Sequence, residues 1–279
     1  MSAGSRRVAF TALAGAAAAL ALAFLALPVL AIFLRVSPGE LLARLDDRVV
    51  LDALAVTAKT NGIAFAITLL VGTPAAYLLA TRRFRGRALV VTLCELPLVL
   101  PPAVAGIGLL AAFGRLGLLG GTLGALGLQV GFTQAAVVLA VAFVAGPFYL
   151  RPAIAAFEAV DPTLLAAART LGASPGRTFL RVALPLASGG LGAGAALSLA
   201  RGLGEFGATI MFAGSLQGVT QTVSLAIYAQ FDVDFTQALA MGALLVVLSA
   251  AVLLAIKVAP LWRRSASTSP ALFAPSTSR

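Results

Sequence analysis

The sequence contains no histidine, one cysteine and two lysines in 279 residues. The lack of histidine excludes Ser/His and Cys/His nucleophilic sites and every histidine-based metal site. With Cys94 alone, neither an intrachain disulfide nor a thiolate metal cluster can form. Neither Lys59 nor Lys257 lies in a G-x-x-x-x-G-K-[ST] motif, so the chain has no P-loop of its own. We therefore expect no enzyme, no cofactor and no metal site, and any ATP hydrolysis must occur on another chain.

Charge is also scarce, at 11% of residues, whereas hydrophobic residues make up 60% and the mean hydropathy is +1.02. Soluble domains carry about a quarter charged residues. Runs without Asp, Glu, Lys or Arg cover residues 8–34, 60–81 and 235–256. Each run exceeds the roughly 20 residues that span a bilayer as a helix. The composition predicts an all-α polytopic membrane protein.

Six transmembrane helices account for the apolar segments, at about 8–34, 54–80, 88–112, 132–150, 186–212 and 236–260. The first apolar run is twice the length of a signal-peptide core, so we interpret it as an uncleaved span. This divides the chain into a cytoplasmic N-terminus at 1–7, a transmembrane domain at 8–260 and a Ser/Pro-rich, disordered cytoplasmic tail at 261–279. Outside the spans, residues 37–54 predict an interfacial amphipathic helix, and the glycine-rich segment 113–134 predicts a loop with a short helix.

The basic residues are distributed unevenly over the connecting segments. With the N-terminus inside, the cytoplasmic segments hold fourteen Lys and Arg residues against two acidic residues, and the outer segments hold four Arg against six acidic residues. This asymmetry follows the positive-inside rule and places both termini in the cytoplasm. The net charge of +10 therefore reflects the orientation of the chain in the membrane. It does not indicate a nucleic-acid-binding surface, and we do not expect nucleic acid as a partner.

The longest predicted cytoplasmic connection, about 151–185, contains the start and stop signals of two short helices. Asp161 is a good N-cap, Pro162 suits the first helical position, and Gly172 suits a left-handed residue after the helix end. Ser174 and Pro175 repeat this start for a second helix, which we expect to end at Pro185.

The first of these helices is too short to be stable without a docking surface. Leu164, Ala168 and Leu171 fall on one face, and the small residues 166–168 allow a close approach of another backbone. Arg169 projects where a carboxylate could receive it. The pattern leaves two interpretations open: a loop helix packed on the protein's own surface, or a helix that docks into a partner.

The segment resembles the cytoplasmic EAA loop of permease subunits of ATP-binding-cassette importers. That loop reads Glu-Ala-Ala, three residues, Gly, nine residues, then Ile-x-Leu-Pro. The matching residues stand at the same spacings, with Ala in place of the first Glu: Ala166, Ala167, Ala168, Gly172, Val182, Leu184 and Pro185. The resemblance implies a type I importer permease fold, in which this coupling helix inserts into an ATPase subunit.

Residues 54–256 are similar to the permease subunits of molybdate importers, within the sulfate/molybdate permease superfamily. The similarity lies in LPLVLPPAVAGIGLL, FGRLGLLG, ARTLGAS, LARGLGEFGATIMFAGS and QGVTQTVSLAIYAQF. It implies a homodimer in the bacterial plasma membrane, two ATPase subunits and an extracytoplasmic molybdate-binding protein. Tungstate is an alternative cargo, and a sulfate/thiosulfate permease is the alternative within the superfamily. An ATP-independent secondary anion carrier is the alternative of another class.

Two sets of residues are candidates for the translocation pathway. Pro97, Pro101 and Pro102 interrupt the third span, and broken helices are tolerated in a bilayer where the backbone lines a cavity or is covered by protein. Arg201 and Glu205 are spaced to form an ion pair beside Gly204, and charges within spans default to functional hypotheses. A gate or pathway wall is one interpretation, and a packed kink with a structural ion pair is the other.

Overall fold

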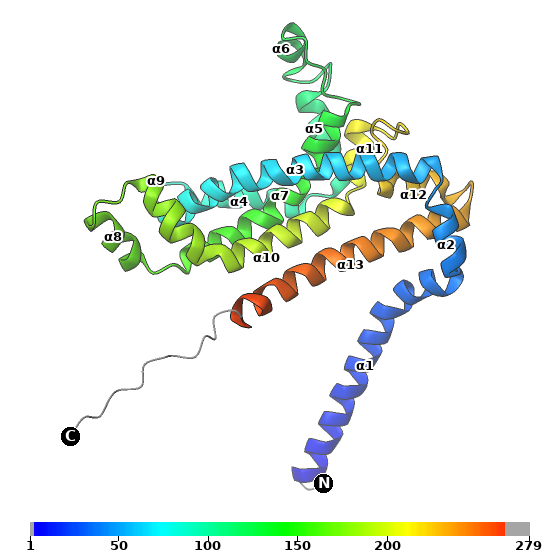
Figure 1. The fold of residues 1–279 in the computed structure, drawn as a ribbon, viewed down its shortest axis with the longest axis horizontal. Coiled ribbons are helices and arrows are strands. Elements are labelled where there is room, and N and C mark those ends of the chain that lie inside the picture. The colour runs from blue at the N-terminus through cyan, green and yellow to red at the C-terminus, as the bar shows by residue number, and fades with distance from the viewer. Residues whose placement is uncertain (1–2, 266–279) are drawn as a thin grey trace, which may run out of the picture.

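The computed structural model describes residues 3–265, and this part of the chain is helical without strands. Figure 1 shows long helices running side by side, with short helices at both ends of the bundle. The elements are α1 Ala3–Arg35, α2 Pro38–Arg44, α3 Arg48–Thr81, α4 Arg87–Val99, α5 Pro102–Phe113, α6 Gly120–Ala125, α7 Gln134–Glu158, α8 Pro162–Thr170, α9 Pro175–Thr178, the π-helical turn η1 Phe179–Ala183, α10 Leu184–Leu203, α11 Gly207–Ala213, α12 Val223–Phe231 and α13 Phe235–Ser265.

Helix α7 is the centre of the bundle and packs against α3 and α10 along most of its length. Its residues 135–150 carry no charged side chain on any side, which is typical of a helix enclosed by others. Small side chains at its contacts, such as Ala136, Ala140 and Ala153, are fully buried and allow the neighbouring backbones to approach closely. Two core clusters lie along α7, one towards its start with α5 and α11, and one towards its end with α3 and α10.

Within residues 3–265, five helices are long and apolar enough to cross a membrane, and α4 and α5 add a sixth span if they are counted together. The all-α multispan class is confirmed, but two predicted spans are not continuous helices. The span predicted at 88–112 bends by 117° between α4 and α5. The span predicted at 186–212 ends as α10 at Leu203, and α11 is a separate short helix. In both places proline or glycine interrupts the helical hydrogen bonding.

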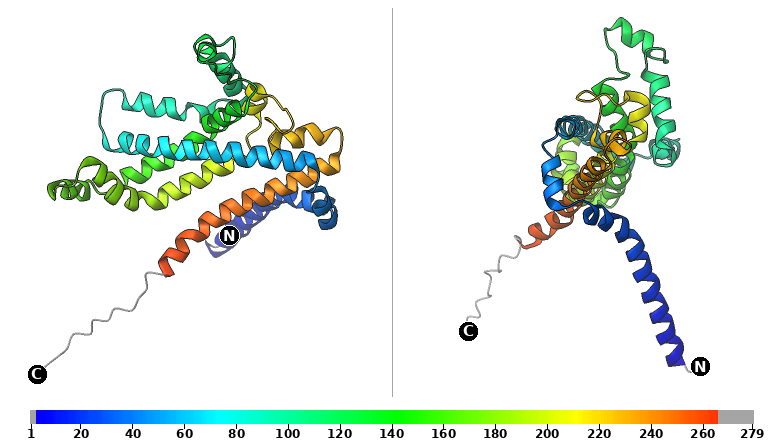
Figure 2. Two further views of the ribbon diagram at one scale, coloured as in Figure 1. Left: turned by 45° about the horizontal axis from the view of Figure 1, so that its top comes forward. Right: turned by 90° about the vertical axis from the view of Figure 1, so that its right-hand side faces the viewer.

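Helix α1 diverges from the bundle, as Figure 2 shows from a second side. The most apolar window of the described α1 segment has no buried residue. Leu20 and Phe24, for example, are 73% and 76% exposed. Since an apolar helix cannot stand in water, this surface requires lipid or protein around it.

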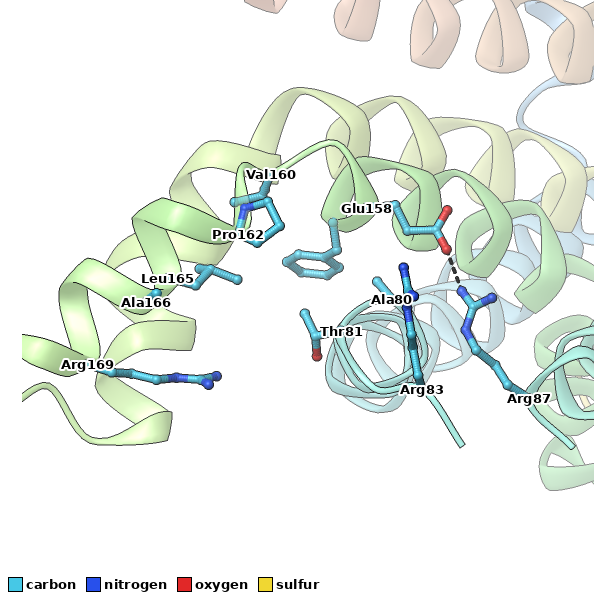
Figure 3. A pocket seen from close by; sticks show the side chains of 11 residues that line it. Ala80, Thr81, Arg83, Arg87, Glu158, Val160, Pro162, Leu165, Ala166 and Arg169 are labelled. Atoms are coloured by element: carbon cyan, nitrogen blue, oxygen red, sulfur yellow. Dashed lines mark hydrogen bonds and ion pairs between the residues drawn. The ribbon is translucent and has the colours of Figure 1, made fainter. Parts of the chain in front are cut away.

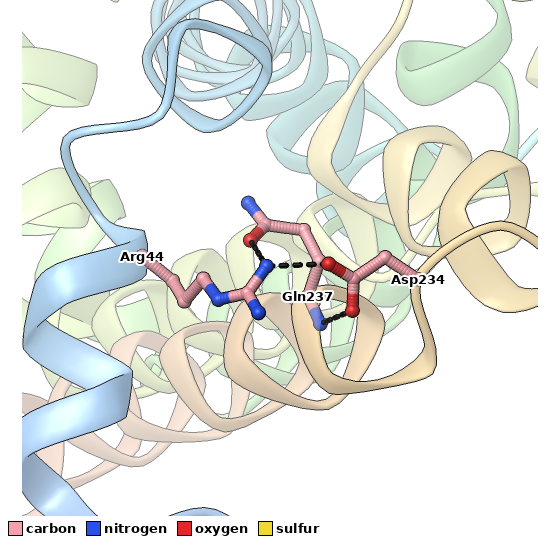
Figure 4. A network of polar contacts seen from close by, with 3 residues as sticks. All are labelled: Arg44, Asp234 and Gln237. Carbon is pink, nitrogen blue, oxygen red and sulfur yellow. Dashed lines mark hydrogen bonds and ion pairs between the residues drawn. The ribbon is translucent and has the colours of Figure 1, made fainter.

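The predicted interfacial segment forms α2, which a capping box of Ser37 and Glu40 starts. It is shorter than expected, because α3 already begins at Arg48. Arg44 at the end of α2 pairs with Asp234 and donates a 3.3 Å hydrogen bond to Gln237, which ties α2 to the start of α13 (Figure 4). The predicted short helix in the glycine-rich loop is α6, which projects beyond the bundle with the end of α5.

The predicted start of the C-terminal tail needs a correction. Helix α13 continues to Ser265, so residues 261–265 are helical rather than part of a disordered tail. The rest of that tail lies outside the described residues.

Candidate functional site

The start of α8 is fixed by its own sequence. The Asp161 carboxylate accepts a 2.8 Å hydrogen bond from the Thr163 backbone N–H, and Pro162 is the first helical residue. The backbone hydrogen bond from Thr163 holds the pKa of Asp161 below its ordinary value of 3.8. The predicted N-cap is confirmed, and it satisfies one of the donors that a helix start leaves unpaired.

The end of α8 is a Schellman motif. Gly172 N–H donates to Arg169 O and Ala173 N–H donates to Ala168 O, each at 3.0 Å. Gly172 has a φ of +82°, a conformation that costs little only for glycine. The predicted left-handed glycine is therefore confirmed, and α8 is a single short helix with both ends capped.

The apolar residues of α8 and its C-cap lie on two different sides of the helix. Leu165 is buried with Phe157 and Ala183 in the core cluster at the end of α7. Leu164 is 47% exposed and Leu171 88% exposed, whereas Ala168 is partly buried. Leu165 was not predicted to contribute, although the adjacent leucines at 164 and 165 indicate that two sides of the helix are apolar. One side of α8 packs on the bundle, and the other is free among the described residues.

The second helix of the loop does not end at Pro185, contrary to the expectation. Ser174 caps α9, but the chain continues through η1 directly into α10. Pro185 has no N–H for the carbonyl of Arg181, and its ring would crowd that carbonyl. The π-turn widens the helix just before it, with Leu184 N–H donating to Phe179 O. Leu184 and Pro185 thus belong to the first turn of α10.

The proline-rich break between α4 and α5 is packed against α11. Pro97 lies within α4, Pro101 is in the extended connection, and Pro102 is the first residue of α5. A Cβ on Gly106 would lie 2.6 Å from Ala208 O, and one on Gly207 would lie 2.8 Å from Cβ of Pro102. The two helices therefore meet backbone to backbone, a contact that only glycine permits at these positions.

Arg201 and Glu205 form the expected ion pair, with 2.8 Å between Nη2 and Oε2. Only 1% of the Glu205 side chain is exposed, and its Oε1 accepts a 2.7 Å hydrogen bond from Ala208 N–H at the start of α11. The guanidinium of Arg201 also lies 6.0 Å from the centre of the Phe148 ring. Glu205 lies beyond the end of α10. The Arg201–Glu205 pair therefore connects α10 to the start of α11 and is not an ion pair within one helix. No atom would lie within 4 Å of a Cβ placed on Gly204 between them.

We call the contact of α5, α10 and α11 the inner junction, defined by Gly106, Arg201, Glu205, Gly207 and Ala208. Helix α11 links two predicted features there, since its Gly207 lies against Pro102 and its Ala208 N–H donates to Glu205, the partner of Arg201. Pro97 lies on α4 on the other side of the break, and the residues of the predicted coupling loop lie at the opposite end of α10 (Figure 1).

Two further ion pairs, between α4 and α7, were not predicted. Arg87 pairs with Glu158, and Arg151 Nε lies 3.4 Å from Glu95 Oε1. The arginine comes first in α4 and in α7, so the antiparallel helices match opposite charges at two levels. This pattern was present in the sequence as two Arg–Glu spacings of seven and eight residues. These two ion pairs hold α4 against α7, although α4 has no buried residue.

Solved structures of importer permeases have this fold. The chain matches the structure of a bacterial ABC transporter that imports alginate with a TM-score of 0.69, at 15% identity, covering 95% of this chain and 98% of that chain. At this level of identity the likeness shows a shared fold, that of a membrane-spanning transporter subunit.

Residues 72–261 match the family described as the binding-protein-dependent transport system inner membrane component. The chain belongs to this family. It is 44% identical over 233 residues to the molybdenum transport system permease protein ModB of Mycobacterium tuberculosis, covering 84% of this chain and 88% of that protein. It is 40% identical over 178 residues to ModB of Escherichia coli K12, covering 63% of this chain and 78% of that protein.

Proposed function

We propose that this chain is the membrane-spanning subunit of an ATP-driven importer of molybdate, with tungstate as a second cargo. The observation that carries the proposal is the 44% identity to a molybdenum transport permease over 84% of the chain. An alignment that covers 84% of the chain must include the middle of the sequence, where α8 and the helices of the inner junction lie. Molybdate, tungstate and sulfate are tetrahedral dianions of similar shape. The choice of molybdate among them therefore rests on the identity to the molybdenum permease.

We propose that α8 docks into an ATPase subunit through Leu164 and Leu171. A helix of nine residues is marginal alone, and its outer apolar face is exposed. Two copies of the chain would then carry two ATPase subunits, and an extracytoplasmic molybdate-binding protein would deliver cargo to the opposite end. ATP hydrolysis belongs to the partner because this sequence has no P-loop.

Deletion of the gene tests the cargo. We expect loss of molybdoenzyme activity and of labelled-molybdate uptake at low external molybdate, with restoration of activity at high molybdate and normal growth on sulfate. Sulfate auxotrophy with normal molybdoenzymes would instead assign a sulfate permease. Uptake that persists after the partner ATPase has lost its catalytic residues would assign a secondary anion carrier.

Cysteine labelling tests the orientation, with both termini and α8 in the cytoplasm. In a Cys94→Ser background, Ser174→Cys should resist an impermeant reagent in intact cells, and Asp46→Cys should react. Reaction at position 174 would reverse the topology and remove the docking role of α8.

A further inference from the structure

A cavity of about 530 Å³ lies behind α8, on the side that faces the bundle. Its walls come from α8, from the ends of α3 and α7, and from the connection into α4 (Figure 3). The polar side chains that line it are Thr81, Arg83, Arg87, Glu158 and Arg169.

The cavity carries an unbalanced positive charge. Three arginines face one glutamate, which gives a net charge of +2. Arg87 is already satisfied, because it pairs with Glu158 and its Nε donates a 2.6 Å hydrogen bond to Leu79 O. Among the described residues, the side chains of Arg83 and Arg169 have neither an ion pair nor a hydrogen bond. Figure 3 shows Arg169 pointing from α8 into the space between α8 and Thr81 at the end of α3.

Helix α8 supplies no anion to this cavity. Ala166 lines it and its side chain ends at Cβ, so the space beside Arg169 is left open. The exposed Leu164 and Leu171 are not among the lining residues. Arg83 and Arg169 are themselves exposed, so an anionic group from solution or from the membrane surface can reach both.

We propose that the cavity binds a phosphate-type oxyanion between Arg83 and Arg169. Guanidinium groups offer paired N–H donors that match the oxygens of a phosphate, and such charge-assisted hydrogen bonds are the strong ones. The bound anion joins α8 to the α3–α4 connection and so fixes the position of a helix that is otherwise held by Leu165 and its own caps. The phosphate is either a free ion or the headgroup of an anionic lipid. This site is separate from the cargo and does not depend on the proposed function.

Calorimetric titration of the full-length protein in phosphatidylcholine nanodiscs with inorganic phosphate, at constant ionic strength, tests the free-ion source. We expect saturable binding by the wild type and an affinity at least about tenfold lower for Arg169→Gln and Arg83→Gln. Arg177→Gln is the matched control, because Arg177 is an exposed arginine of the same loop outside the cavity and its loss changes the net charge equally. It should bind like the wild type.

Ala166→Glu separates anion binding from damage to α8. Glutamate is a good helix former and keeps every arginine, but it places a carboxylate in the cavity. We expect phosphate binding to fall at least about tenfold, while amide hydrogen exchange of residues 162–171 stays as slow as in the phosphate-bound wild type. Undiminished phosphate binding by Ala166→Glu would overturn the site.

Native mass spectrometry after reconstitution with phosphatidylglycerol tests the lipid source. If the anion is a headgroup, the wild type shows no phosphate isotherm but retains more phosphatidylglycerol than Arg169→Gln and as much as Arg177→Gln. If the wild type and both arginine variants behave alike in phosphate binding and lipid retention, the proposal is wrong.

Discussion

Helix α8 and the inner junction are held by different kinds of contact. The ends of α8 are set by residues within the same short segment: Asp161 bonds to Thr163, and Gly172 and Ala173 close the last turn. The inner junction also joins residues that are about a hundred positions apart, with Gly106 against Ala208 and Pro102 against Gly207. Local capping fixes the shape of a helix, whereas only the long-range contacts fix where broken spans lie relative to one another.

The largest expected effect is at the glycine contact of the inner junction. Gly106→Ala places Cβ 2.6 Å from a backbone oxygen and 2.9 Å from Cα of Ala208, which no change of side-chain rotamer can relieve. We expect a loss of about 3 kcal/mol of stability, measured by thermal unfolding in detergent. Gly108→Ala is the control in the same helix, since no atom lies within 4 Å of its Cβ. Equal unfolding temperatures for the two variants would contradict the close contact.

The buried ion pair comes next. Glu205→Gln keeps the shape but removes the charge that faces Arg201, and we expect a loss of about 2 kcal/mol because Arg201 is only 27% exposed. Glu158→Gln removes a carboxylate that is 48% exposed and should cost less than about 1 kcal/mol. The same unfolding experiment compares them. A larger cost for Glu158→Gln would reverse the roles assigned to the two pairs.

A smaller and local effect is expected at the end of α8. Gly172→Val forces a β-branched residue into φ +82°, at a cost of about 1–2 kcal/mol, although the space around it is open. Amide hydrogen exchange of α8 should accelerate, and the amount of ATPase that co-purifies should fall several-fold. Gly176→Val, in open space without a positive φ, is the control and should change neither. Unchanged α8 exchange in Gly172→Val would remove the strain argument.

The smallest expected effect is the response of the α8 cap to acid. Because the pKa of Asp161 is lowered in the folded state, its contribution is complete above the ordinary value of 3.8 and is lost as the pH falls through the lower folded value. Protection of the Thr163 amide, corrected for intrinsic exchange, should therefore decline below pH 3.8. Asp161→Asn retains an acceptor without a titrating group, and its protection should not follow this decline.

The same contrast explains what the sequence could predict. Asp161, Pro162, Gly172 and Ser174 act on their immediate neighbours, so their pattern predicted both helix starts and the turn. The apolar runs likewise predicted the spans of α3, α7 and α13, because length and hydropathy are properties of one segment.

Features that depend on distant segments were not predictable in the same way. The prolines indicated a break after α4, but the angle of 117° depends on how α11 meets Gly106. The separate α11 and the continuation of α10 through Pro185 were missed for a different reason. The start of α11 carries a local hydrogen bond from Ala208 N–H to the buried Glu205, and α10 follows a local π-turn, and hydropathy reveals neither.

The continuity of α9, η1 and α10 has a mechanical consequence. Residues Pro175–Leu203 form one helical segment of 29 residues, roughly 43 Å long at 1.5 Å per residue. One end follows α8 by a short turn, and the other carries Arg201 beside the inner junction. A displacement of α8 would therefore reach Arg201 through one helical segment rather than through a flexible linker.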